Sequence, residues 1–94
     1  MITINRLSTN RISIVTMHDG VDYTSVVDGI EWTFKVVDGR VIVERSGSRP
    51  AISTDIEGEI TVPPRLGGLV VTGIGNCAFE NCKKLTKINL PNSI

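Results

Sequence analysis

The sequence predicts a mainly β fold, with antiparallel β-hairpins over residues 1–50 followed by the start of a repeat solenoid over residues 51–94. Three observations support this prediction. Val, Ile and Thr dominate the first half of the chain, and such branched side chains suit the pleated surface of a sheet. Asp-Gly pairs, which favour tight hairpin turns, recur between the apolar runs. Nearer the C-terminal end, an alternating strand pattern occurs twice, and self-similarity at a fixed spacing indicates a solenoid.

Length and charge restrict the function classes. The 94 residues are enough for one domain with a modest core. Ten basic and ten acidic residues balance, so we expect no nucleic-acid partner, because binding to phosphates depends on Lys and Arg. The richest basic cluster, Lys83, Lys84 and Lys87, has no interleaved aromatic residue and is interpreted as a solvated face. No apolar run approaches the roughly 20 residues of a membrane span, so no membrane insertion is expected, and no secretion signal is visible.

The first half is expected to turn at its Asp-Gly pairs. These are Asp19-Gly20, Asp28-Gly29 and Asp38-Gly39. The clearest hairpin has strands at residues 34–37 and 40–43, because a type I′ turn needs positive φ at both central residues. The aspartates are interpreted as turn residues rather than as a calcium or paired-carboxylate site, since their spacing lacks the alternation of an EF-hand loop. Residues 45–54 are expected to form a loop.

The repeat aligns residues 59–66 with residues 87–94. We call the shift that carries Ile60 onto Ile88 the repeat offset. Alternation places Ile60 and Val62 inward in the first copy, and Ile88 and Leu90 inward in the second. One such unit cannot bury its apolar face alone, so neighbouring units must stack. The opposite strand face is exposed and is our candidate partner-binding surface, on which four polar side chains project: Glu59, Thr61, Lys87 and Asn89.

The segment between the two strands is expected to form one short helical turn. Asn76 is placed to cap it, and Ala78, Phe79 and Cys82 have the spacing of one buried helical face. The Phe79 side chain is predicted to fill the space between the strand and this turn. Cys77 and Cys82 are predicted to be buried free thiols. A disulfide scaffold needs more cysteines, and a zinc site more ligands, than this chain offers.

Residues 74–91, IGNCAFENCKKLTKINLP, resemble the BspA-like leucine-rich repeat. Residues 58–63 are similar to the usual entry into that family's first repeat, and residues 32–43 to the hairpin that precedes it. The resemblance implies a bacterial cell-surface or secreted protein that binds other proteins, in adhesion or in contact with a host. It also implies that this chain is the N-terminal fragment of a longer array, with one and a half repeats behind a capping β-region.

Two other functions remain open on the sequence. Gly73-Ile74-Gly75-Asn76-Cys77-Ala78 follows an apolar strand and has the outline of a dinucleotide-binding turn, the mark of an oxidoreductase. It lacks the long helix, second strand and later acidic residue that this site needs, so we expect no enzyme, catalytic residue, metal or cofactor. The chain is alternatively a structural cap with no ligand. Finally, an exposed apolar edge predicts self-association at the C-terminal end: Leu85, Ile88, Leu90 and Ile94.

Overall fold

The computed structural model describes residues 17–94, which contain seven strands. They are β1 (Asp22–Val27), β2 (Ile30–Val37), β3 (Arg40–Val43), β4 (Gly58–Thr61), β5 (Arg65–Leu66), β6 (Leu69–Ile74) and β7 (Leu85–Asn89). No helix forms among these residues. The mainly β class predicted from the sequence is therefore confirmed. Any hairpin expected within residues 1–16 lies outside the described residues.

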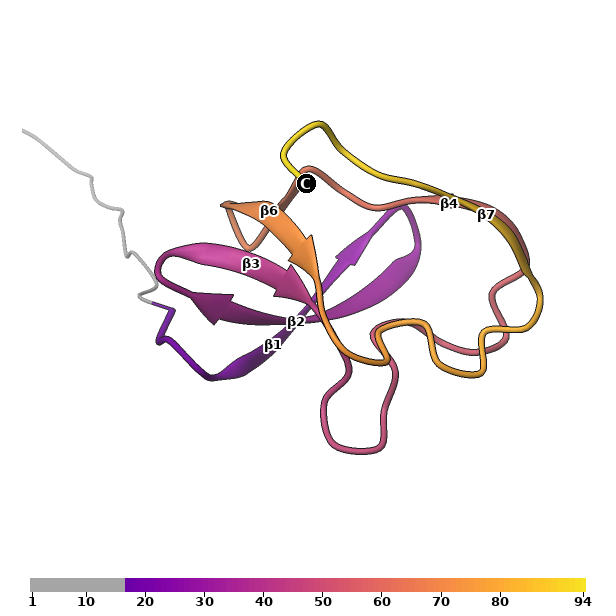
Figure 1. Cartoon of the computed structure of the whole chain (residues 1–94), viewed down its shortest axis with the longest axis horizontal. Helices are drawn as coiled ribbons and strands as arrows, with labels where there is room; N and C mark the ends of the chain where they lie inside the picture. The colour runs from indigo at the N-terminus through magenta and orange to yellow at the C-terminus, as the bar shows by residue number, and fades with distance from the viewer. Residues whose placement is uncertain (1–16) are drawn as a thin grey trace, which may run out of the picture.

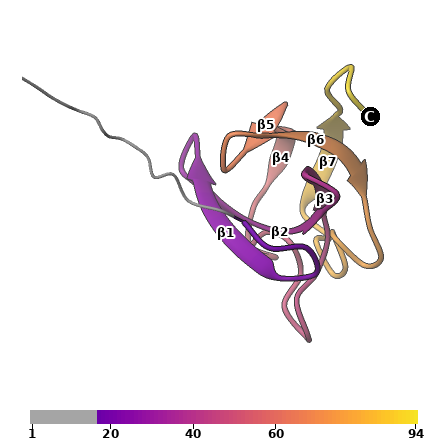
Figure 2. The same cartoon turned by 90° about the vertical axis from the view of Figure 1, so that its left-hand side faces the viewer.

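The strands form two sheets that enclose one interior. The larger sheet has five strands in the order β1-β2-β3-β6-β5, and the smaller pairs β4 with β7 (Figure 1). Seen from the side, the strands surround the interior in a nearly closed, barrel-like arrangement (Figure 2). This arrangement lets each sheet bury its apolar face against the other.

Tight turns at Asp-Gly pairs connect β1 to β2 and β2 to β3, and both strand pairs are antiparallel. The φ angles are 51° at Asp28 and 79° at Gly29, and 51° at Asp38 and 74° at Gly39. Positive φ at both central residues is the requirement of a type I′ turn, which matches the twist of the flanking strands. Asp19 instead precedes β1, where its carboxylate accepts a hydrogen bond of 3.0 Å from the Asp38 N–H.

Two parallel pairings join segments that are far apart in the sequence. β4 pairs with β7 so that Ile60 lies opposite Ile88, which is the repeat offset of the sequence. β3 pairs with β6 so that Val41 lies opposite Val71, at a similar separation along the chain. The chain therefore passes first through β3 and β4 and later through β6 and β7. β6 then lies beside β3, and β7 lies beside β4. The larger sheet contains strands from both sides of residue 50, because β1, β2 and β3 precede that residue and β5 and β6 follow it.

One hydrophobic core serves both halves of the chain. Alternate residues of β2 point into it, and Trp32 and Phe34 are its largest buried side chains. Thr33, between them, is also buried, and its N–H donates a hydrogen bond of 2.8 Å to the Ala51 carbonyl. The buried apolar residues come from both sides of residue 50: Trp32, Phe34, Val36, Val41, Val43, Ala51, Ile52, Ile60, Val62, Leu66, Val71 and Ala78.

Residues 76–81 form successive turns and no helix, so the predicted helical turn is wrong. Cys77 and Asn81 have φ angles of 54° and 62°, and these left-handed conformations interrupt a right-handed helix. The Glu80 N–H still donates to the Cys77 carbonyl over 3.2 Å, and the Cys82 N–H to the Phe79 carbonyl over 3.1 Å, so two short turns follow one another. Ala78 is nonetheless buried, and Phe79 packs partly buried against the core, so the apolar side of this segment faces inward.

The inward placement predicted for Leu90 is also wrong, because 53% of this residue is exposed. β7 ends at Asn89, and Pro91 follows Leu90. Alternation between the two faces of a sheet holds only while the strand continues. Ile88, still within β7, is half-buried and packs against the core as expected.

Candidate functional site

The four residues predicted for partner binding lie together on the β4–β7 sheet. Glu59 and Thr61 flank the buried Ile60 on β4, so their side chains are exposed. The parallel register places Glu59 opposite Lys87, and Thr61 opposite Asn89. We call this set, Glu59, Thr61, Lys87 and Asn89, the polar face.

Asn89 connects the members of the polar face. Its side-chain Nδ2 donates a hydrogen bond of 2.7 Å to Glu59 Oε2 and lies 3.4 Å from Thr61 Oγ1. Lys87 Nζ lies 3.9 Å from the same Glu59 oxygen, and the two side chains are 64% and 56% exposed. An ion pair this exposed contributes about 0–1 kcal/mol to stability, so these contacts orient the side chains more than they stabilise the fold.

The polar face combines four kinds of polar group. It presents one carboxylate, one ammonium group, one amide and one hydroxyl on the paired strands β4 and β7. A mixed set of donors and acceptors of this kind can pair with the polar groups of another protein surface.

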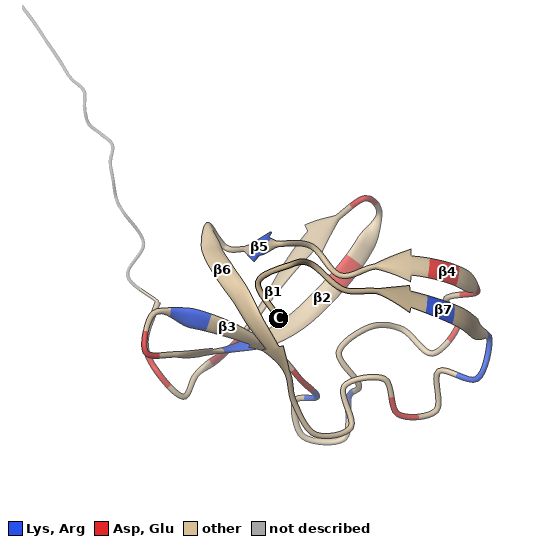
Figure 3. Cartoon of the chain, turned by 45° about the horizontal axis from the view of Figure 1, so that its top comes forward, with Lys and Arg blue, Asp and Glu red and all other residues tan. Residues whose placement is uncertain are grey.

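Opposite charges extend along the same two paths beyond the polar face. Asp55, Glu57 and Glu59 lie in β4 and the loop before it, and we call them the acidic row. Lys83, Lys84 and Lys87 lie in β7 and the loop before it, and form the basic row. Figure 3 shows red on and before β4 beside blue on and before β7. Sequence reasoning missed Asp55 and Glu57, although the repeat offset aligns Asp55 with Lys83.

The two glycines of the dinucleotide-like turn have packing roles. Gly73 lies in β6, where a side-chain Cβ would come within 2.9 Å of Ile42 Cδ1 on β3. A Cβ at Gly75 would collide with the side chain of Glu44, and the Gly75 N–H donates to the Val43 carbonyl over 2.7 Å. A carboxylate therefore occupies the space beside Gly75, where a dinucleotide site would need room for a negatively charged pyrophosphate.

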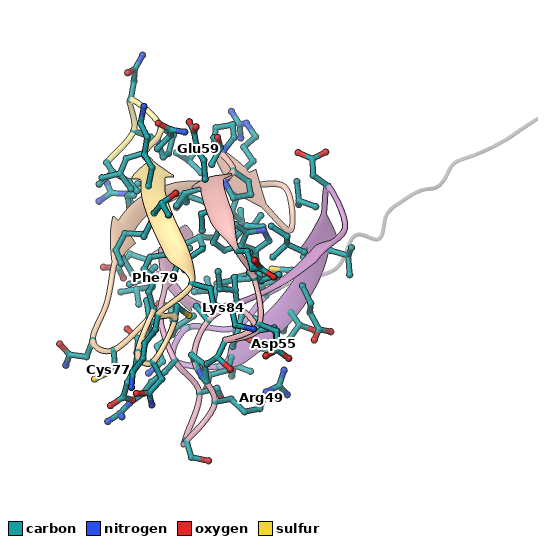
Figure 4. The ribbon with its side chains drawn as sticks, turned by 90° about the vertical axis from the view of Figure 1, so that its right-hand side faces the viewer. Arg49, Asp55, Glu59, Cys77, Phe79 and Lys84 are labelled. Atoms are coloured by element: carbon teal, nitrogen blue, oxygen red, sulfur yellow. The ribbon has the colours of Figure 1, made fainter. Side chains whose placement is uncertain are left out.

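Both cysteines are free thiols, but they differ in exposure. Cys77 is exposed, so its predicted burial is wrong: its positive φ lets the chain reverse there, and its side chain points away from the fold (Figure 4). Cys82 is partly buried and packs against the core. Burial raises the pKa of the Cys82 thiol, because desolvation disfavours the thiolate.

A shallow groove of about 520 Å³ lies between the start of β2 and the loop before β4. Ile30, Ile52 and Ile56 supply its apolar surface, and an ion pair of 3.5 Å between Arg49 and Glu31 lies at its rim. Among residues 17–94 no three His, Cys, Asp or Glu side chains gather as a metal site would need. The same residues contain no helix with the length and apolarity of a membrane span.

Comparison of the chain with protein-family models, curated proteins and solved structures finds no match. Its function is therefore inferred from its own residues and their geometry.

Proposed function

We propose that this chain opens a leucine-rich-repeat solenoid of the BspA-like type and acts as a non-enzymatic protein-binding module. In this proposal β3 with β4, and β6 with β7, are successive turns of the solenoid. The two parallel pairings support it, because a solenoid stacks equivalent strands in parallel at the period of its repeat. The register of β4 with β7, which sets Ile60 opposite Ile88, equals the repeat offset of the sequence.

In the same proposal β1 and β2 form the N-terminal cap. A terminal unit must cover the apolar side of the first repeat, since no earlier repeat does so. Trp32 and Phe34, both on β2, are almost fully buried against residues of the later strands. By its resemblance to BspA-like proteins, the module would work on a bacterial cell surface or in a secreted protein, in adhesion or host contact.

The observation that carries the binding function is the polar face. Four polar side chains from two strands project on one side: Asn89 donates hydrogen bonds to Glu59 and Thr61, and Lys87 lies 3.9 Å from Glu59. Side chains ordered in this way lose less conformational entropy when a partner binds than free ones do. The alternatives are a cap without a ligand and an oxidoreductase, and the Glu44 carboxylate beside Gly75 argues against the second.

A photo-crosslinking residue placed at Thr61 tests this proposal. The matched control is the same residue at Thr24, which is also an exposed strand threonine but lies on β1. Both variants are mixed with extracts of host cells and of bacterial surfaces and then irradiated. The Thr61 variant should crosslink to a defined protein that the Thr24 variant does not capture. Binding of that purified protein should weaken at least fivefold in Lys87→Ala and Asn89→Ala.

Equal capture from both positions, or unchanged affinity in both variants, would place binding elsewhere. NAD and NADP serve as the test of the enzyme alternative. Neither should raise the melting temperature of the chain, and a saturable rise with either would favour the dinucleotide site over the polar face.

A further inference from the structure

The groove between the start of β2 and the loop before β4 has an aliphatic interior. Ile30 belongs to the β2 wall, and Ile52 and Ile56 come from the loop. Pro50 and Ala51 also line the groove, and Ile52 is almost fully buried, so it forms the base. A concave, mostly apolar hollow of about 520 Å³ is typical of a site that holds a small ligand or part of a larger one.

The β2 wall of the groove carries main-chain groups without a partner strand. Ile30 lies opposite Val27 across a two-residue turn, so these two residues exchange hydrogen bonds within the β1–β2 pair. Such residues alternate with residues whose N–H and C=O groups point away from the neighbouring strand, and Glu31 is the next one. On that side β3 pairs only with residues 34–37 of β2. The Glu31 N–H and carbonyl therefore have no hydrogen-bond partner among residues 17–94.

Thr33 shows which way these groups of Glu31 point. Its N–H, two residues further along β2, donates to the Ala51 carbonyl over 2.8 Å. The loop before β4 thus occupies the edge of β2 at Thr33, and the position beside Glu31 is the next one along the same edge. Both Glu31 and Thr33 line the groove, so this free position faces it. A free N–H and C=O on a strand edge are the groups to which an added strand pairs.

We propose that the groove binds an extended peptide segment of a partner protein, which pairs with the main chain of Glu31 and places one aliphatic side chain against Ile52 and Ile56. In strand addition of this kind, main-chain hydrogen bonds supply affinity, and the pocket that takes the side chain supplies specificity. The groove shares no residue with the polar face, so this site goes beyond the proposed function. A further repeat would stack on the edge of β7 that β4 does not occupy, and would leave the groove open.

The rim of the groove determines which side chain the peptide can insert. Arg49 (Figure 4) and Glu31 form an ion pair of 3.5 Å there, and both side chains are more than half exposed. They are the only charged residues among those that line the groove, and they already pair with each other. A charged side chain on the peptide would lose water without gaining an opposite charge. The inserted side chain is therefore uncharged and aliphatic, and a branched one such as Val or Ile suits an extended main chain.

Titration of the isotope-labelled chain with the blocked peptide acetyl-Thr-Ser-Ile-Ser-Thr-amide tests the proposal. This peptide is uncharged and offers an extended main chain with one aliphatic side chain. The backbone amide signals of residues 29–33 and 51–56 should shift and saturate, whereas those of the polar face should not. A second peptide carries N-methyl groups on its Ile and both Ser residues, which removes the central main-chain donors. It should bind at least about fivefold more weakly, because the Glu31 carbonyl then stays unpaired.

Ile56→Thr and Val26→Thr form a matched pair of variants. Each replaces a branched aliphatic side chain with a polar one of similar shape, but Val26 is an exposed residue of β1 and does not line the groove. The first peptide should bind at least about fivefold more weakly to Ile56→Thr, because apolar contact is lost, and equally well to Val26→Thr. The amide spectrum of each variant without peptide establishes that it is folded, and the comparison of the two peptides decides alone if Ile56→Thr unfolds.

Three results would overturn the proposal. The first is the absence of saturable shifts at the groove, including shifts confined to the polar face. The second is equal affinity for the two peptides, which would show that the main chain of Glu31 does not pair with the ligand. The third is an equal loss of affinity in Ile56→Thr and Val26→Thr, which would place the aliphatic side chain outside the groove.

Discussion

The indole ring of Trp32 and the phenyl ring of Phe79 meet edge to face, with centroids 6.4 Å apart and ring planes at 89°. Trp32 lies on β2, and Phe79 lies in the turns between β6 and β7. This arrangement brings the positive edge of one ring to the negative face of the other, and is worth about 0.5–1.5 kcal/mol beyond the burial of area. One aromatic contact thus joins the N-terminal hairpin to the later strands.

Replacing Phe79 with Ala should destabilise the fold by about 2–3 kcal/mol, below the roughly 3–5 kcal/mol of a fully buried Phe, because Phe79 is only partly buried. Chemical denaturation measures this change. The fluorescence of Trp32, the one tryptophan of the chain, should also shift to longer wavelength in the folded variant as its surroundings loosen. Leu90→Ala is the control and should cost less than about 0.5 kcal/mol, since Leu90 is exposed. Equal losses in both variants would show that Phe79 is not a core contact.

The two thiols should react at different rates. Cys77 is exposed and should be alkylated rapidly in the native protein, whereas partly buried Cys82 should react slowly. Because the pKa of Cys82 is raised, its thiolate fraction at pH 8 is below that of an ordinary thiol, and raising the pH should speed its reaction. Mass spectrometry of peptides from a time course measures both rates. Equal rates at pH 8 would contradict the difference in burial.

Gly75→Ala should cost more stability than Gly73→Ala. At Gly75 the new Cβ would meet the Cβ of Glu44 at 2.7 Å, and this atom cannot move without the backbone. At Gly73 it would meet only Ile42 Cδ1, the end of a flexible side chain. We expect about 1–3 kcal/mol for Gly75→Ala and less than about 1 kcal/mol for Gly73→Ala by chemical denaturation. The reverse order would show that Glu44 does not pack against Gly75.

Asn89→Asp should destabilise the fold by up to about 1 kcal/mol at neutral pH, because it replaces an amide donor to Glu59 with a second carboxylate. The destabilisation should shrink in acid, where protonation removes the repulsion. Asn92→Asp, at an exposed position after β7, is the matched control and should have little effect. Melting temperatures from pH 3 to pH 8 compare the two. A loss at Asn89 that does not depend on pH would assign it to packing rather than to charge.

Local patterns predicted those parts of the fold that local geometry determines. The positive φ of Asp38 and Gly39 follows from the residue types, so the turn between residues 37 and 40 was predictable. The polar face was also predictable, because strand alternation exposes Glu59 and Thr61 while Ile60 is buried. The parallel pairing of β3 with β6 had no local signal, since it depends on contacts between segments far apart in the sequence.

The errors arose where backbone conformation overrides side-chain spacing. The apolar spacing of Ala78, Phe79 and Cys82 suggested a helix, but two residues with positive φ produce the same inward side chains from turns. Burial of Cys77 was inferred from the average behaviour of free cysteines, and its own conformation places it outside. Asp55 and Glu57 were missed because they precede residue 59, where the aligned repeat begins.

The most direct test of the central claim, that the chain stacks equivalent strands in parallel, is a set of interstrand nuclear Overhauser contacts between backbone protons. We expect contacts in which both residue numbers rise together, as residues 59–61 meet residues 87–89 and residues 41–43 meet residues 71–74. Contacts in which one residue number rises while the other falls, the pattern of antiparallel strands, would contradict it. So would the absence of any contact between residues 59–61 and 87–89.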